Sequence, residues 1–326
     1  MLGSTRTVAT GGAMQLQVIR LEGSAARVGG AELAGPGAIR WLDVAPTPEA
    51  LAFLAERFHF HPLALEDCAH EDQRTKFETY DGHLFTVVHR LQPSADETDL
   101  TMVELNAFLT GEALVTVHSG PLPELDQVFA RCVREPEVLA RGPDFALYLL
   151  HDALTDLHFT LVDHLTEEVE AIAAEVLSRD VAPDVAARIA QARRQHATMR
   201  RRLSPQREVF AALARPGQGL VKDQTAVYFR DVVDHVVRLT EEVDMGRDLL
   251  ASSMETHLSQ TNNRLSLVTT RLTLVATIFL PLNFVAGFFG MNLEILPARL
   301  AVPVVLAAVT LLPVGMWLFF RRKGLL

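Results

Sequence analysis

Residues 272–292 have the sequence LTLVATIFLPLNFVAGFFGMN, which contains no aspartate, glutamate, lysine or arginine. Residues 300–320, LAVPVVLAAVTLLPVGMWLFF, form a second stretch without these charges. A helix rises about 1.5 Å per residue, so each stretch is long enough to cross a hydrocarbon core of roughly 30 Å. The pattern predicts two transmembrane helices, and the alternative is a pair of helices buried in a soluble core.

The topology follows from the segments beside these helices. Residues 293–299 form a short loop, so the two helices are expected to be an antiparallel hairpin. Residues 321–326, which include Arg321, Arg322 and Lys323, follow the second helix directly. Because basic residues prefer the cytoplasmic side, we expect a multi-pass protein of the cell (inner) membrane with both termini in the cytoplasm and the loop outside.

Composition excludes several classes of protein. The net charge of the 326 residues is -10, yet residues 271–326 contain five basic residues and one acidic residue, so the acidic excess lies in residues 1–270. An acidic body argues against nucleic acid as a partner and suits cations. The two cysteines exclude a disulfide scaffold. The sequence has no P-loop, GxSxG, HExxH or GxGxxG motif, so we expect no enzymatic activity.

The body divides by pattern into successive regions. Residues 1–13 are rich in small residues and are expected to be disordered. Residues 14–143 combine strand patterns with a helix that begins at Thr47-Pro48, which predicts a cytoplasmic α/β domain. Residues 144–220 predict a helical hairpin. Residues 221–292 predict a stalk helix, on the order of 100 Å long, that continues as the first transmembrane helix. The fold class is an α+β membrane protein.

The first membrane helix carries a sparse stripe of polar side chains: Thr269, Thr273, Thr277, Asn283 and Asn292. Two transmembrane helices cannot enclose an aqueous pore, and an unpaired amide in lipid is costly. The stripe therefore favours a ring of identical subunits with this helix at its centre. The alternative for the threonines is that each bonds the preceding turn of its own helix and serves only helix packing.

The tripeptide Gly290-Met291-Asn292 stands at the outer end of this helix, before a short loop and a second span. In that setting the segment Ala276–Asn292 resembles the most recognisable segment of the CorA family of divalent-cation channels. The stretches His61–Asp67 and Gln73–Lys76 resemble a cytoplasmic segment of the same family, and Tyr228–His235 resembles its stalk segment. The resemblance covers roughly residues 40–326.

The resemblance implies a funnel-shaped homopentamer in the lipid bilayer. It makes Gly290, Met291 and Asn292 an external selectivity filter, within an external GMN loop that continues through residues 293–299. It also places a set of pore-lining side chains below the filter, with apolar constrictions at two leucines and an acidic ring at the cytoplasmic end: Asn283, Leu280, Thr277, Leu272, Thr269, Ser266 and Glu255.

The resemblance also assigns a regulatory role to two carboxylates. Asp67 and Asp231 match the pair with which the family senses intracellular Mg²⁺ across a subunit interface. A divalent ion between two carboxylates converts their repulsion into a bridge, so high internal Mg²⁺ would hold the ring closed and its loss would open the pore. From the residues alone, the alternative is a solvated surface carboxylate at each position.

Three functions follow, in this order of preference. The first is a passive channel for Mg²⁺, and also Co²⁺, driven by the membrane potential. The second is a Zn²⁺ transporter that resembles ZntB, with or without proton coupling; Met291 favours the Mg²⁺ branch, because the ZntB branch usually has Ile or Val there. Ala298 and Arg299 follow Pro297 where the family commonly has an acidic residue, which leaves the ion preference open. The third is a membrane-anchored scaffold without transport.

Overall fold

The computed structural model describes residues 16–22, 25–30, 33, 39–95, 99–178, 181–217, 219–290 and 298–323. By packing, the chain divides into two units, Met1–Ser253 and Met254–Leu326. The boundary between the units falls inside one helix, α7 (Asp223–Gly290). The first unit contains a sheet with helices on both faces, and the second contains the end of α7 together with one more helix.

A seven-stranded sheet of order β2-β1-β3-β7-β6-β5-β4 forms the centre of the first unit. Neighbouring strands are antiparallel except for β3 and β7, which are parallel. The central strands β5 and β7 are buried on both faces, and β5 buries several polar side chains, among them His83, Thr86 and His89, beside its apolar ones. The strands are β1 (Leu16–Glu22), β2 (Ala25–Gly29), β3 (Ile39–Val44), β4 (Lys76–Tyr80), β5 (His83–Pro93), β6 (Leu100–Thr110) and β7 (Leu114–Val117).

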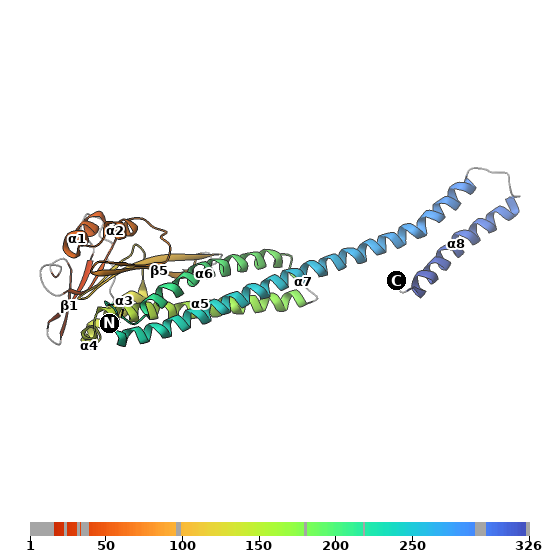
Figure 1. Ribbon diagram of the computed structural model, residues 1–326. Coiled ribbons are helices and arrows are strands. Elements are labelled where there is room, and N and C mark those ends of the chain that lie inside the picture. The colour runs from red at the N-terminus through yellow and green to blue at the C-terminus, as the bar shows by residue number, and fades with distance from the viewer. Residues whose placement is uncertain are drawn as a thin grey trace. The chain divides into compact units, whose positions relative to one another are not determined.

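Two short helices, α1 (Pro48–Phe58) and α2 (Pro62–Ala69), cover one face of the sheet (Figure 1). Each begins with a proline in its first turn, and each has a side-chain cap. Thr47 Oγ1 accepts a hydrogen bond from the Ala50 N–H at 3.2 Å, and His61 Nδ1 accepts one from the Leu63 N–H at 3.3 Å. Because both helix starts are fixed in this way, α2 has a defined position over the sheet.

The other helices of the first unit cover the opposite face of the sheet (Figure 1). They are α3 (Pro123–Arg134), α4 (Pro136–Arg141), α5 (Pro143–Leu177), α6 (Val185–Leu213) and the first part of α7. Within this part, α7 buries one stripe of side chains that includes Phe229, Val236 and Val243. The stripe packs with α5 and α6 into one apolar cluster, which attaches the stalk segment of the chain to the sheet.

The second unit contains the C-terminal part of α7 and helix α8 (Ala298–Arg322), which includes the whole of the second predicted span. Among the described residues, α7 is the one helix long and apolar enough to cross a membrane, and only 6% of its most apolar window is buried. Leu272 is 66% exposed and Leu280 is 74% exposed. A surface this apolar requires either lipid or another protein chain to cover it.

A Gly246→Ala substitution is expected to destabilise the first unit, although alanine is intrinsically the better helix former by about 1 kcal/mol. A Cβ at Gly246 would lie 2.5 Å from Nε2 of His196, a buried ring whose Nδ1 donates to the Ala192 carbonyl at 2.8 Å. Overpacking of this kind costs about 1–3 kcal/mol. We expect the melting temperature of the full chain in detergent, followed by circular dichroism, to fall by about 2–4 °C.

The matched control is Gly111→Ala, whose added Cβ meets only Leu220 Cδ2 at 4.0 Å and should leave the melting temperature nearly unchanged. In a protein that already has the substitution His196→Ala, Gly246→Ala should not lower the melting temperature further, because the ring that the new methyl group meets is then gone. A higher melting temperature for Gly246→Ala alone would show that α6 and α7 are not in close contact here.

Candidate functional site

The predicted filter lies at the end of α7. Gly290 is the last residue of this helix, whereas Met291 and Asn292 lie outside the described residues. The other predicted pore residues all belong to α7, and all of their side chains are exposed: Glu255, Ser266, Thr269, Leu272, Thr277, Leu280 and Asn283. The structure therefore leaves each of them available to another chain, to water or to lipid.

These exposed side chains share one side of the helix. With about 100° of rotation per residue, the seven positions from Glu255 to Asn283 fall within a face roughly 140° wide. We call this surface the α7 polar–leucine face. Leu272 and Leu280 interrupt its polar groups, so a path along the face would pass alternately over polar and apolar side chains.

Two threonines of α7 on this side of the helix, Thr273 and Thr277, already use their hydroxyl protons. Thr273 Oγ1 donates to the Thr269 carbonyl at 2.9 Å, and Thr277 Oγ1 donates to the Thr273 carbonyl at 2.7 Å. This is the local bonding that the packing alternative expects. The lone pairs of each hydroxyl oxygen stay available, so these threonines can still accept a hydrogen bond from water or face a hydrated cation.

Asp67, on α2, is held by a lysine of its own chain. Lys76 Nζ donates to Asp67 Oδ2 at 2.5 Å and lies 3.2 Å from Glu78 Oε1. Burial by itself would lower the pKa of Lys76, but the hydrogen bonds to Asp67 and Glu78 outweigh burial and raise it. Lys76 is thus firmly charged at neutral pH, and a cation that binds Asp67 must compete with it.

Asp231, on α7, has a side chain that is 66% exposed and lies 3.7 Å from Nε2 of His235. The sheet separates it from Asp67, because α2 packs on one face and this part of α7 packs on the other (Figure 1). The two carboxylates therefore do not meet within one chain. A single ion can join them only if they come from different copies.

A group of possible metal ligands that the sequence analysis missed lies beside Asp231. The group consists of Asp152 and Asp156 on α5 and His235 on α7. Each residue offers one ligand atom, and the three atoms lie within 4.8 Å of one another. Burial and the charge of Asp156 raise the pKa of Asp152, and the charge of Asp231 adds to this effect. The signal that could have identified this group is a four-residue spacing on each helix, because residues four apart lie on the same side of a helix. Asp152 and Asp156 have this spacing on α5, and Asp231 and His235 have it on α7.

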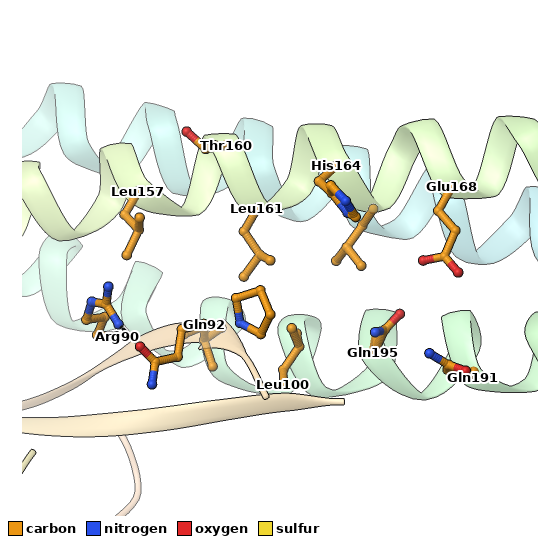
Figure 2. A pocket seen from close by; sticks show the side chains of 13 residues that line it. Arg90, Gln92, Leu100, Leu157, Thr160, Leu161, His164, Glu168, Gln191 and Gln195 are labelled. Carbon is orange, nitrogen blue, oxygen red and sulfur yellow. Dashed lines mark hydrogen bonds between the residues drawn. The ribbon is translucent and has the colours of Figure 1, made fainter. Parts of the chain in front are cut away.

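A larger cavity, of about 620 Å³, lies between α5, α6 and the ends of β5 and β6 (Figure 2). Leucines on its walls, among them Leu157, Leu161 and Leu100, make its middle apolar. Arg90, at one end, is paired with Glu124, whose Oε2 lies 2.7 Å from Nε. The opposite end is polar and includes Glu168, Gln191 and Gln195 (Figure 2).

Comparison with known proteins identifies the class. A family model described as "CorA-like Mg2+ transporter protein" matches residues 36–322, so the chain belongs to the CorA family of divalent-cation transporters. Membership in a family of transporters confirms the expectation that the chain is not an enzyme, and together with the exposed apolar part of α7 it makes the chain a membrane protein. Its substrates are divalent cations.

Individual relatives support the same assignment. The chain is 32% identical to the cobalt/magnesium transport protein CorA of Thermotoga maritima, covering 83% of this chain and 78% of that protein. It is 31% identical to the putative metal ion transporter YfjQ of Bacillus subtilis, covering 87% and 89%. The complete structure of the CorA magnesium transporter from Methanocaldococcus jannaschii has a TM-score of 0.83 at 20% identity, covering 95% and 98%. This likeness confirms the predicted fold of an α/β domain with a long helix.

Proposed function

We propose that five copies of this chain form a passive channel that carries Mg²⁺, and also Co²⁺, into the cell down the membrane potential. The observation that carries the proposal is the α7 polar–leucine face, which is exposed along its length and ends at Gly290. A single helix of this kind cannot by itself enclose water. A ring of copies lets each α7 present the same face to a common axis.

The proposed filter suits the chemistry of a hydrated dication. Mg²⁺ loses its water reluctantly and is usually bound with several waters retained. Five Asn292 side chains can offer neutral amide oxygens to those waters, which attracts the ion without trapping it. Gly290 permits a tight turn that aims Asn292 inward, and Met291 packs beneath. Asn283 forms a second polar ring, and rings of Leu280 and Leu272 close the path by excluding water.

The membrane potential supplies the driving force for uptake. A potential of 100 mV, negative inside, is worth about 4.6 kcal/mol for a dication that moves inward, at about 2.3 kcal/mol per elementary charge. No second ion or nucleotide is required, in agreement with the absence of a P-loop from the sequence. The basic C-terminus and the large acidic body are cytoplasmic in this arrangement.

Regulation by intracellular Mg²⁺ is assigned to Asp67 of one subunit and Asp231 of the next. Their separation by the sheet within one chain favours such an arrangement, because only a neighbouring copy can bring them together. Binding requires the ion to displace Lys76 from Asp67. Asp152, Asp156 and His235 offer further ligands beside Asp231, so the same interface can hold more than one cation.

Flux into liposomes distinguishes this function from the alternative, a Zn²⁺ transporter similar to ZntB, because Ala298 stands where the family commonly has an acidic residue and leaves the ion preference open. Purified protein is reconstituted with a fluorescent indicator for Mg²⁺, Co²⁺ or Zn²⁺ inside. We expect Mg²⁺ and Co²⁺ entry that is indifferent to a proton gradient. Zn²⁺ entry that rises with an inward proton gradient and persists without voltage would favour the alternative, and no flux of any ion would favour a scaffold.

The number of subunits is tested separately. Native mass spectrometry of the protein released from detergent should give the mass of five chains. A monomer would contradict the proposed ring, since a single α7 cannot enclose a path for a hydrated ion.

A further inference from the structure

A second, smaller cavity lies in the first unit, where the segment that follows α2 crosses β5 and β6. Its volume is about 90 Å³, enough for an ion with one or two waters at about 30 Å³ per water. Three of the side chains that line it are carboxylates and one is a histidine. The full lining consists of Glu71, Asp72, His89, Met102, Val103, Glu104, Ser119 and Gly120. The cavity contains none of the residues of the proposed channel or of the Asp67–Asp231 pair.

The sheet itself brings together the two inner groups of this cavity. His89 on β5 and Glu104 on β6 are directly opposed partners in the antiparallel pairing, so their side chains share one face. Nε2 of His89 lies 3.9 Å from Oε2 of Glu104. Two atoms that bind the same tetrahedral Zn²⁺ at about 2.1 Å lie about 3.4 Å apart, so a small movement of Glu104 would suffice.

His89 is oriented with one nitrogen toward this carboxylate and cavity. The ring is 1% exposed, and its Nδ1 lies 3.0 Å from the Thr75 hydroxyl, which fixes the ring plane. Nε2 has no hydrogen-bond partner in the part of the chain that the structure describes. A buried polar atom left in this state destabilises the folded protein, and a ligand at Nε2 would remove that cost.

The electrostatics keep His89 neutral and ready to bind. Burial is the main cause that lowers the pKa of His89 to about 4, and the nearby charge of Arg202 acts in the same direction, while the backbone of Gln73 and the charge of Asp72 offset part of that fall. A neutral imidazole is the form that binds metals. Arg202 is one positive charge beside the three carboxylates of the cavity, so the surroundings of the ring stay net negative.

Glu104 is held in place by two donors. It accepts hydrogen bonds from the Gln73 N–H at 2.7 Å and from Asn106 Nδ2 at 2.8 Å. Burial raises its pKa, the two hydrogen bonds offset part of that rise, and the charge of Asp72 adds to it. A cation in the cavity would relieve the repulsion between Glu104 and Asp72, because both carboxylates would then face a positive charge.

Asp72 supplies the third group from the rim of the cavity. Its side chain is exposed, and its backbone has a φ of 72°, in the left-handed region. Asp72 lines the same cavity as His89 and Glu104, and its charge raises the pKa of both groups. An exposed carboxylate can rotate inward at little cost, and Glu71 beside it offers another oxygen ligand.

We propose that His89, Glu104 and Asp72 form a binding site for a divalent transition-metal ion of the Zn²⁺ or Co²⁺ type. One nitrogen with carboxylate oxygens is a ligand set that suits these ions, whereas Mg²⁺ prefers oxygen and water alone. The site would let the first unit bind Co²⁺ or Zn²⁺ separately from Mg²⁺. It does not depend on the proposed channel, since it requires only the folded first unit.

The test is equilibrium dialysis of the full chain in detergent against Zn²⁺ or Co²⁺, with a large excess of Mg²⁺ to fill sites built from oxygen alone. We expect each of the variants His89→Gln and Asp72→Asn to bind one ion per chain fewer than the unchanged protein. A variant that still binds this ion should bind it at least about 10-fold more weakly. Asp72→Asn is the variant least harmful to folding, because the residue is exposed and Asn tolerates a left-handed backbone. The visible spectrum of bound Co²⁺ should change in the same variants.

His164→Gln is the matched control, because it removes an exposed imidazole from α5 that does not line this smaller cavity. This variant should bind Zn²⁺ or Co²⁺ as the unchanged protein does. Asp231→Asn should likewise retain the site. Equal stoichiometry and affinity in Asp72→Asn and the unchanged protein would overturn the proposal. Displacement of the ion by Mg²⁺ would overturn the transition-metal assignment.

Discussion

Asn292→Ala is expected to reduce the initial rate of Mg²⁺ entry into liposomes by at least about 100-fold, which corresponds to about 2.7 kcal/mol of barrier. In the proposed ring the substitution removes five amide oxygens at once, and methyl groups cannot replace them as partners for the waters of Mg²⁺. The measurement is the initial rate at a fixed inside-negative potential, with equal amounts of reconstituted protein.

The control for this experiment is Gln260→Ala, which removes an amide from the side of α7 opposite the polar–leucine face. Its rate should stay within about twofold of that of the unchanged protein. Undiminished entry through Asn292→Ala would show that the tripeptide is not the filter. Equal losses in both variants would show that the face does not line the path.

Asp67→Asn is expected to weaken closure of the channel by internal Mg²⁺, with the half-maximal Mg²⁺ concentration raised at least about 10-fold. The substitution removes one of the two charges that the ion bridges. Lys76→Met is the opposite change, because it removes the ammonium group whose Nζ lies 2.5 Å from Asp67 Oδ2. With this competitor gone, the Mg²⁺ concentration for half-maximal closure should fall. The measurement is resistance to limited proteolysis, and flux, as functions of Mg²⁺.

A structural effect on α2 would move the two variants in the same direction, since each breaks the same ion pair. Opposite shifts therefore identify competition between Lys76 and the ion. If neither variant moves the Mg²⁺ dependence, Asp67 is an ordinary surface carboxylate and regulation lies elsewhere.

Local chemistry made parts of the fold predictable from the sequence. Thr47-Pro48 predicts the start of α1, and the structure confirms both the cap and the proline in the first turn. The start of α2 at His61-Pro62 was missed, because histidine is not a usual cap. The edge strand β4, with the sequence KFETY, was also missed, because three of its five residues are polar or charged.

Side-chain partners were beyond reach for a different reason. Lys76 faces Asp67 because β4 returns beside α2, and Asp152 meets His235 because α5 packs on α7. The pairing of His89 with Glu104 depends on the register of β5 and β6, which the sequence pattern does not specify to the residue. Thr269, Thr277 and Asn283 were predicted from the polar stripe of the first membrane helix, whereas Leu272, Leu280, Ser266 and Glu255 came from the family resemblance. The roles of all of them stay predictions.

The most direct test of the account is the dependence of Mg²⁺ entry on voltage. Liposomes that contain the purified protein and a Mg²⁺ indicator are set to defined potentials with a potassium gradient and valinomycin, at equal pH on both sides. The account predicts entry that increases steeply as the inside becomes negative and stops at zero potential when Mg²⁺ is equal across the bilayer. Entry that ignores the potential, or that occurs only with a proton gradient, would contradict it.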